Sequence, residues 1–323
     1  MFSFVQNRFR FYAVAIGLTV FSLISPWIFG INLGIDMTGG IQVEYSVENG
    51  DVASGIENAK TIAHTLEEKL LIGGKKVING INVYGIAGTN SFIVEAGFAG
   101  DETITEVMIQ DAKASFTKDL TATLSDNTST KITQSRYINI GESFGAYIKK
   151  SGYITLTLTI IMIAVYIAYA FRGSIPGMAS WPFAVVTGVS LLHDVIVAFG
   201  LYVATSFFFP EFKIDTFFMT AMLTILWYSI NDTIVVMDRI RSNLGENGKK
   251  TGLSHVIDDS IHQTMTRSLL TSSTVFIVLL GLFFFGPESL KGFTLALLFG
   301  TVVGTYSSIC IASPLLIDIT KRK

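Results

Sequence analysis

Six stretches of this sequence are long and apolar enough to cross a lipid bilayer, and no other feature constrains its fold as strongly. A helix that spans the hydrocarbon core needs about 20 mostly apolar residues. The six stretches are Phe11–Phe29, Tyr153–Phe171, Met178–Thr205, Thr216–Met237, Ser268–Phe285 and Gly292–Ile317. Because backbone polar groups in lipid must be paired within the protein, these stretches predict an α-helical polytopic membrane protein with six transmembrane helices.

Composition and charge support this class and argue against several others. Half of the 323 residues are hydrophobic and only 15% are charged, whereas soluble domains carry about 25% charged residues. A net charge of −2 without a basic tract argues against binding to nucleic acid. The single cysteine, Cys310, excludes a disulfide framework within the chain. The first stretch is too long for a cleavable signal peptide, so we expect it to remain as a membrane anchor.

Lysine and arginine are distributed unevenly between the two sides of the predicted membrane domain. Short cytoplasmic loops of membrane proteins are enriched in these residues. One side contains Arg8, Arg10, Arg172, Arg239, Arg241, Lys249, Lys250, Lys321, Arg322 and Lys323. The short loops on the opposite side contain only Lys213 and Lys291. We therefore expect both chain ends and a loop at about 238–267 to be cytoplasmic.

A long polar segment follows the first span and has the composition of a soluble domain. Ile41–Val47 alternates apolar and polar residues, as a half-buried strand does. Apolar residues recur at helical spacing in two segments, 51–71 and 102–124. Three more segments are predicted strands, namely 81–86, 92–98 and 131–140. This β-α-β-β-α-β order is that of a ferredoxin-like α+β domain, although order alone does not determine the strand pairing.

The predicted organisation therefore has three parts. Residues 1–29 contain a short cytoplasmic N-terminus and the first span. Residues 30–151 form the extracytoplasmic domain. Residues 152–323 form a five-helix membrane domain with a short cytoplasmic tail.

Three ionisable residues lie within the predicted spans or at the edge of one, and a charge at the centre of a span costs about 2.5–3.5 kcal/mol on insertion scales. Asp194 and Asp232 lie in the third and fourth spans, and Arg267 precedes the fifth by one residue. Burial and an approaching arginine shift the proton affinity of an aspartate in opposite directions, so a moving helix could load and release a proton. Polar residues Asn231 and Thr233 flank Asp232. We therefore predict an ion-coupling site formed by these five residues.

A static interpretation of the same residues stays open. Asp232 and Arg267 could form a fixed ion pair that ties two helices together, or Arg267 could extend to the membrane surface. His193, next to Asp194, could be a packing residue rather than a proton relay. The sequence also leaves the coupling ion open, because hydroxyl and amide groups around Asp232 could ligate sodium as readily as they could line a proton path.

Four motifs, in this order along the chain, resemble the SecF family. Gly34-Ile-Asp-Met-Thr-Gly-Gly40 is similar to that family's Asp-Phe-Thr-Gly-Gly signature, with Met37 in place of the usual aromatic residue. The other three motifs are Thr224–Arg241, Thr266–Ser273 and Gly304–Ser308. In Thr224–Arg241, the motif of the fourth span, Trp227 stands where glycine is typical. The resemblance implies one half of an RND-type unit of twelve membrane helices, completed by SecD.

The resemblance also implies a function and its partners. It implies an accessory subunit that pairs with SecD, associates with the SecYEG channel and YajC, and lies in the bacterial inner membrane. It implies use of a proton or sodium gradient to help pull an unfolded preprotein outward after SecA has pushed it. It assigns the ion path to Asp232 and Arg267. It assigns the junction between the first span and the outer domain to Asp36, Thr38, Gly39 and Gly40.

Three other classes of function are weighed against this one. A half-size RND-type exporter of small molecules or lipids shares the membrane core, but such proteins usually carry two large outer domains on twelve spans. A passive assembly factor of a membrane complex needs only a static ion pair. An enzyme is least favoured, because no nucleophile with a base and no cluster of metal ligands is evident. Gly248–Thr251 lacks the upstream glycine of a phosphate loop, and we expect no cofactor other than the coupling ion.

Overall fold

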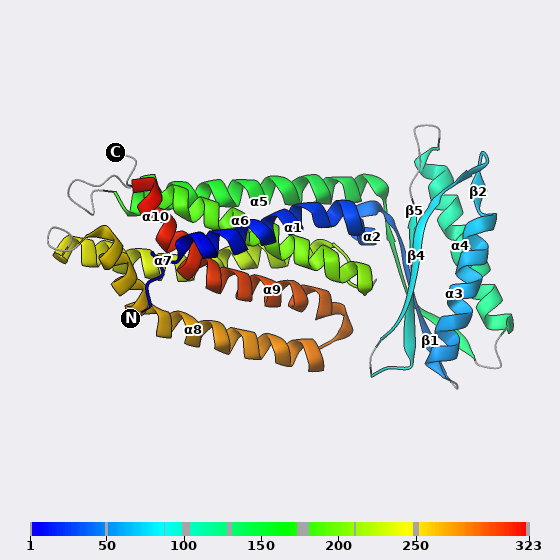
Figure 1. The fold of residues 1–323 in the computed structure, drawn as a ribbon. Coiled ribbons are helices and arrows are strands. Elements are labelled where there is room, and N and C mark those ends of the chain that lie inside the picture. The colour runs from blue at the N-terminus through cyan, green and yellow to red at the C-terminus, as the bar shows by residue number, and fades with distance from the viewer. Residues whose placement is uncertain are drawn as a thin grey trace. The chain divides into compact units, whose positions relative to one another are not determined.

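The computed structural model contains two compact units (Figure 1). It describes residues 2–48, 51–86, 88–98, 104–127, 131–172, 181–209, 211–247 and 252–320. The helical unit consists of Met1–Ile31, Tyr153–Phe208 and Phe217–Lys323, and the α/β unit consists of Asn32–Gly152 and Phe209–Thr216. Some residues used in the sequence analysis lie outside the described ranges, namely 101–103, 178–180, 248–251 and 321–323.

The six predicted spans are confirmed as long apolar helices, so the chain is a multi-pass membrane protein. Five of them are single helices: α1 (Arg8–Phe29), α5 (Glu142–Ala170), α6 (Trp181–Phe208), α7 (Thr216–Asn247) and α8 (Leu253–Phe285). The sixth consists of η1 (Glu288–Leu290), α9 (Lys291–Ser307), the π-helical turn η2 (Ser308–Ala312) and α10 (Ser313–Thr320). The region predicted as a loop at about 238–267 is helical in its described part except at Gly252, because α7 continues to Asn247 and α8 begins at Leu253.

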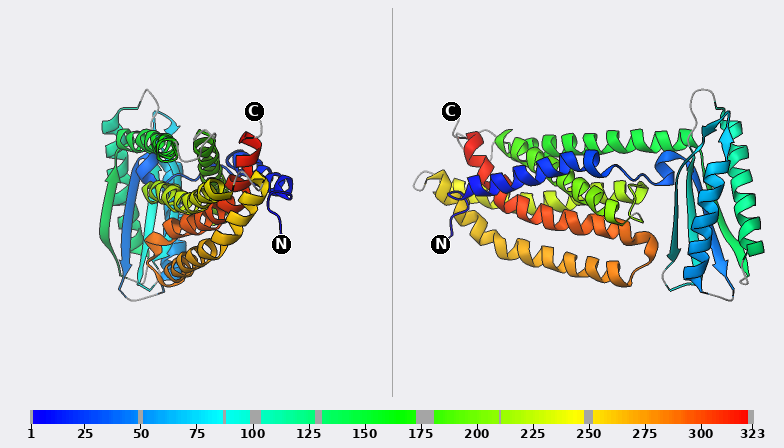
Figure 2. Two further views of the ribbon diagram at one scale, coloured as in Figure 1. Left: turned by 90° about the vertical axis from the view of Figure 1, so that its left-hand side faces the viewer. Right: turned by 45° about the vertical axis from the view of Figure 1, so that its right-hand side comes forward.

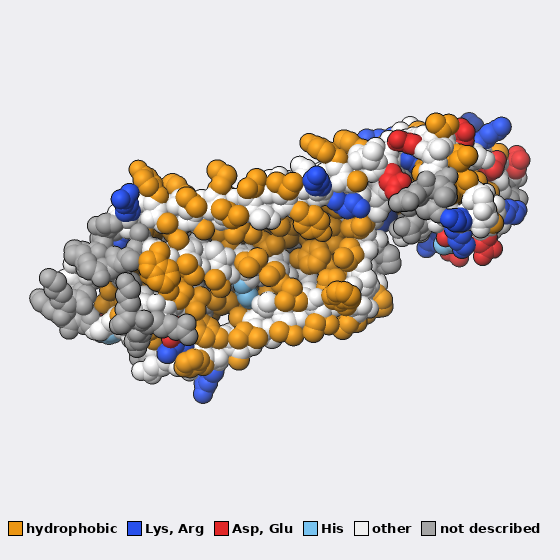
Figure 3. Space-filling view, turned by 90° about the horizontal axis from the view of Figure 1, so that it is seen from above, with side chains coloured by type: hydrophobic (Ala, Val, Ile, Leu, Met, Phe, Trp, Pro, Cys, Tyr) orange, Lys and Arg blue, Asp and Glu red, His pale blue; other side chains and the backbone are white. Residues whose placement is uncertain are grey.

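The helical unit exposes large apolar side chains and buries hydroxyl groups, which is the pattern expected for a protein whose solvent is lipid. On α5, Met162 and Tyr169 are 70% and 73% exposed. Hydrophobic side chains dominate the face of the helices drawn in Figure 3. Inside the unit, Ser22 and Ser25 of α1 are buried, and Ser25 Oγ donates to the Gly200 carbonyl oxygen of α6 at 3.1 Å. Small residues let the two backbones approach closely, as is common between membrane helices.

Two glycines on α9 bring this helix against α7. A Cβ atom added at Gly300 would collide with the Ile225 side chain, and one added at Gly304 would lie 3.1 Å from Ser229 Cβ. This close contact places the C-terminal end of α9 beside the polar residues of α7. The packing of small residues therefore positions the site described below.

The α/β unit is a four-stranded antiparallel sheet whose one face is covered by two helices (Figure 2). Its strands are β1 (Gly40–Val47), β4 (Ile78–Ile86), β5 (Ser91–Phe98) and β6 (Ile132–Ile140), in the spatial order β4-β5-β1-β6. The helices are α3 (Val52–Lys69) and α4 (Glu106–Asn127), and the short elements are α2 (Ile35–Thr38), β2 (Leu71–Ile72) and β3 (Lys75–Lys76). The main elements follow the predicted order, whereas the β2-β3 hairpin was not predicted. The ferredoxin-like classification stays a prediction.

The core of the α/β unit follows from the alternation in β1. Ile41, Val43, Tyr45 and Val47 are buried against α3 and α4, while the residues between them are at most half-buried. The Tyr45 hydroxyl is within 2.9 Å of Thr121 Oγ1 on α4. Burial of the ring raises the pKa of Tyr45 to about 12.

Candidate functional site

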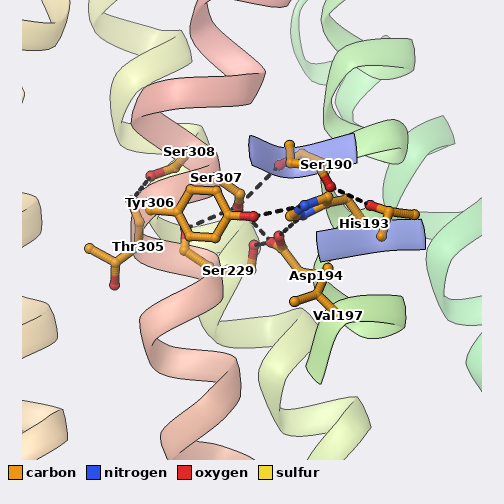
Figure 4. A network of polar contacts seen from close by, with 12 residues as sticks. Ser190, His193, Asp194, Val197, Ser229, Thr305, Tyr306, Ser307 and Ser308 are labelled. Carbon is orange, nitrogen blue, oxygen red and sulfur yellow. Dashed lines mark hydrogen bonds and ion pairs between the residues drawn. The ribbon is translucent and has the colours of Figure 1, made fainter. Parts of the chain in front are cut away.

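Asp194 is the centre of a buried polar cluster formed by three helices of the helical unit (Figure 4). The side chain of Asp194, on α6, is completely buried. Its Oδ1 atom lies 3.0 Å from His193 Nδ1, and its Oδ2 atom accepts hydrogen bonds from Ser229 Oγ of α7 at 2.5 Å and Ser307 Oγ of α9 at 2.8 Å. The three donors satisfy both oxygens, so the cluster ties α6, α7 and α9 together.

The ring of His193 extends this cluster toward α9. Nδ1 faces the Asp194 carboxylate, and in the neutral tautomer that donates from Nδ1, Nε2 accepts a hydrogen bond from the Tyr306 hydroxyl at 2.8 Å. Ser190 Oγ, one turn before Asp194, donates to Ser307 Oγ at 3.3 Å. The cluster is therefore a continuous chain of hydrogen bonds. Such a chain is compatible both with a proton relay and with a packing role, and the role of His193 stays a prediction.

Asp232 forms a second acidic centre, one helical turn after Ser229 on α7. It is half-buried, and its Oδ2 atom accepts a hydrogen bond from Ser308 Oγ, at the first residue of the π-helical turn η2. Ser307 therefore binds Asp194 while its neighbour Ser308 binds Asp232. Single π-helical turns within α-helices are frequent at functional sites. Here the turn begins at Ser308, which binds Asp232 and directly follows the residue that binds Asp194.

A cavity of about 290 Å³ adjoins Asp232 between α7 and α8. Its walls include Asn231, Asp232, Arg267 and Ser268. The Ser268 hydroxyl is buried and has no hydrogen-bond partner among the described residues. The cavity thus combines an acid, a base and an unsatisfied hydroxyl, which are groups that can bind water or an ion.

Arg267 also lines this cavity. The side chain is exposed, and among the residues that the structure describes no hydrogen bond or ion pair involves its guanidinium group. In this conformation Arg267 and Asp232 share a cavity but do not form the fixed ion pair of the static interpretation. Trp227, which also lines the cavity, is 64% exposed, so most of its bulky ring lies outside the packed interior of the helical unit.

The predicted ion-coupling residues are therefore distributed over three environments. Asp232, Arg267 and Asn231 share the cavity, whereas Asp194 lies in the adjoining buried cluster. Thr233 is buried and its Oγ1 donates to the Ser229 carbonyl of its own helix at 3.0 Å. Sequence reasoning did not assign Tyr306, Ser307, Ser308 and Ser268 to the site. The only signal for the first three was their place in the Gly304–Ser308 motif.

The signature that follows the first span occupies a crowded corner of the α/β unit. Asp36 Oδ2 accepts hydrogen bonds from the Thr216 backbone N–H at 2.6 Å and from Thr216 Oγ1. Gly39 has a φ of 80°, and a Cβ atom there would lie 2.8 Å from Glu142 Cα. A Cβ atom at Gly40 would collide with the Ala96 carbonyl oxygen. Thr38 Oγ1 donates to the Gly34 carbonyl at 3.2 Å, so every signature residue has a local structural contact.

Comparison with known families matches most of this chain. Residues 120–322 match the family model described as "Protein export membrane protein SecD/SecF, C-terminal", and residues 24–51 match the SecD/SecF GG motif. The second match contains the Asp36 signature. The first match contains Asp194, Asp232 and Arg267, so each match includes residues of the sites described above.

Individual relatives cover nearly the whole chain. A protein translocase subunit SecF of Rhodothermus marinus is 31% identical over 99% of this chain and 94% of its own length. A SecDF subunit of Brucella abortus is 30% identical over 90% of this chain and 33% of its own length. The crystal structure of SecDF, a translocon-associated membrane protein from Thermus thermophilus, superposes with a TM-score of 0.75 at 26% identity. That comparison covers 99% of this chain and 39% of the SecDF chain.

Proposed function

Because the chain belongs to the SecF family of protein translocase subunits, we propose that it couples an ion gradient to protein export as an accessory subunit of the Sec translocase. In this proposal it works with SecD to assist unfolded preproteins through SecYEG after SecA has pushed them, and YajC belongs to the same assembly. The observation that carries the proposal is the cavity that Asp232 and Arg267 both line without forming an ion pair with each other. The chain would have no enzymatic activity of its own and no resident cofactor.

The exposed polar groups around the cavity support SecD as the direct partner. Asn231 and Arg267 would meet lipid if the chain were alone, and an arginine in hydrocarbon is costly. SecDF relatives carry both parts in one chain, and this chain corresponds to about a third of such a protein. We propose that the membrane part of SecD covers this face and completes the ion site.

The proposed orientation is in a bacterial inner membrane, with both chain ends in the cytoplasm and the α/β unit outside. The support is the excess of arginine in the first turn of α1, at Arg8 and Arg10, and near the C-terminal end of α7, at Arg239 and Arg241. In this orientation the ion would cross the membrane part toward the cytoplasm. The preprotein would emerge on the side of the α/β unit.

Asp232 is the proposed ion-binding group, and the ion is a proton or sodium. Its one hydrogen bond within the described residues, from Ser308, leaves acceptor capacity on the carboxylate that lines the cavity. Arg267, on a different helix, changes the electrostatic potential at Asp232 when α7 and α8 move relative to each other. Alternate approach and withdrawal of this positive charge would favour release and uptake of the ion.

The main alternative, an exporter of small molecules or lipids, would require a large apolar pocket in the α/β unit. The described part of that unit contains a cavity of about 250 Å³. Polar side chains form much of its wall, including Lys60, His64, Asn82 and Glu211. Ligand pockets for small molecules are typically about 300–1,000 Å³ and mostly apolar. This cavity is smaller and more polar than such a pocket.

The proposal is tested by export of a secretory substrate into membrane vesicles supplied with SecA and ATP. Export is measured with and without an ionophore, and the difference defines the gradient-dependent component. Asp232→Asn should abolish this component and leave ATP-driven export intact. The matched control is Asp238→Asn on the same helix, where the exposed Asp238 pairs with Arg241 at 2.9 Å. A full gradient response in the Asp232 variant would make the passive assembly role the leading account.

A further inference from the structure

We propose that Asp36 is a positioning residue that clamps the first residue of α7 to the α/β unit, so that movement of this unit is transmitted to the helix that carries Asp232. The inference rests on the proposed function and adds the mechanical link to it. It concerns the contact between Asp36 and Thr216, residues that are 180 positions apart in the chain.

The Asp36 carboxylate caps the N-terminus of α7. The first N–H groups of a helix have no partner within the helix, and the helix dipole makes this end attractive to an anion. Asp36 accepts the backbone N–H of Thr216 at 2.6 Å and also its hydroxyl. Caps of this kind usually come from the residue next to the helix in sequence. A cap from a distant segment instead ties the helix end to that segment.

The chain just before α7 is held to the same segment by backbone hydrogen bonds. Gly34 N–H donates to the Ile214 carbonyl at 2.9 Å, and Ile214 N–H donates to the Asn32 carbonyl at 2.8 Å. A Cβ atom at Gly34 would lie 2.9 Å from Asp215 Cβ, so the glycine permits this close approach. The residues before Thr216 therefore have little freedom to move relative to the signature.

A buried ion pair fastens the same segment to the sheet. Lys213 Nζ binds Glu95 Oε2, and both residues are 8% exposed. The Tyr84 hydroxyl donates to Glu95 Oε1 at 2.8 Å. Buried charges that are paired and hydrogen-bonded are costly to separate. This pair and the Asp36 cap together anchor the chain on both sides of Ile214.

α7 is continuous from Thr216 to the ion site. Asp232 lies 16 positions after Thr216, which is about 24 Å along an α-helix. Ser229, which binds Asp194, lies on the same helix. An α-helix is stiff over this length, so a displacement of its clamped end shifts Ser229 and Asp232 relative to α8. The clamp thereby links the α/β unit to the electrostatic environment of Asp232.

The vesicle assay described above tests the clamp with variants at both of its ends. Asp36→Ala should lose the gradient-dependent component of export while ATP-driven export and copurification with SecD remain. Thr216→Val, at an exposed position, should reduce the same component, and Thr216→Ser should restore it. The matched control is Glu48→Ala, which removes an exposed ion pair with Lys131 in the same unit.

A double variant separates positioning from a general structural role. If Asp36 acts through α7, then Asp36→Ala combined with Asp232→Asn should be no worse than Asp232→Asn alone. Full gradient response in both Asp36→Ala and Thr216→Val, or equal loss of ATP-driven export and assembly in both, would overturn the inference. If wild-type vesicles show no gradient-dependent component, the proposed function itself fails. If Asp232→Asn abolishes that component and the clamp variants keep it, only the clamp fails.

Discussion

Ser307 donates a hydrogen bond to the completely buried carboxylate of Asp194 at 2.8 Å. The next residue, Ser308, donates to Asp232. One turn of the last membrane helix therefore contacts both acidic centres. A rearrangement of this π-helical turn would change the hydrogen bonds of both carboxylates. The two carboxylates differ in their burial and in the number of groups that donate hydrogen bonds to them.

Asp194 is expected to stabilise the fold as a buried hydrogen-bond acceptor. Asp194→Ala leaves two buried hydroxyls without their acceptor, and it should lower the free energy of unfolding by about 1–3 kcal/mol. Ser307→Ala removes one donor and should cost about 0.6 kcal/mol. Denaturation of the full chain in detergent micelles measures both values. Asp238→Ala is the exposed control, and equal stability of Asp194→Ala and this control would contradict the prediction.

Arg267 is expected to matter for coupling but not for the stability of the isolated chain. Because its guanidinium has no partner among the described residues, Arg267→Gln should change the free energy of unfolding by less than about 0.5 kcal/mol. The same variant should lose the gradient-dependent component of export in vesicles. A large loss of stability in the purified chain would instead support the fixed ion pair.

Gly300 is expected to tolerate no side chain, because Ile225 occupies the space where a Cβ atom would lie. Gly300→Val should lower the free energy of unfolding by about 1–3 kcal/mol, the usual cost of overpacking. Unfolding in micelles measures this loss. Gly281 on α8 has open space around its Cβ direction, so Gly281→Ala is the control and should be neutral or slightly stabilising. Similar values for the two variants would show that α7 and α9 are not in close contact.

Tyr45 makes the stability of the α/β unit sensitive to alkaline pH. Burial raises its pKa from 10.0 to about 12, so the stability it contributes is complete below about pH 10. As the pH rises from about 10 to 12, the unfolded state loses the phenolic proton first. The free energy of unfolding should then fall by on the order of 2–3 kcal/mol. Tyr45→Phe should flatten this pH profile. The control Tyr147→Phe changes an exposed ring and should leave the profile as it is. Identical profiles for the wild type and Tyr45→Phe would refute the prediction.

The ion pair between Lys213 and Glu95 is expected to be costly to break from one side only. Lys213→Met leaves the Glu95 carboxylate buried without its cation, which should cost about 3–5 kcal/mol. Adding Glu95→Gln removes the stranded charge and keeps an acceptor for Tyr84, so the double variant should recover most of the loss. Thermal unfolding of the three proteins tests this order. Lys131→Met breaks an exposed pair and should cost less than about 1 kcal/mol.

The fold could be predicted from the sequence where it depends on local patterns. The lengths of the apolar stretches predicted six membrane helices, because hydropathy over about 20 residues is a property of contiguous sequence. Alternation in Ile41–Val47 predicted the strand that forms the centre of the core. Asp194, Asp232 and Arg267 could be selected because a charge in an apolar stretch is costly wherever the helix packs.

The contacts of these residues were decided only by the tertiary structure. In the sequence, Ser307 and Ser308 look like ordinary small polar residues of a membrane helix. Their hydroxyls reach the carboxylates of Asp194 and Asp232 because glycines on α9 allow this helix to approach α7. The absence of an ion pair at Arg267 within the described chain, and the cap that Asp36 provides for Thr216, depend in the same way on segments distant in sequence. A sequence pattern specifies which groups are costly to bury, whereas the packing of helices and strands determines which partners come within hydrogen-bonding distance of them.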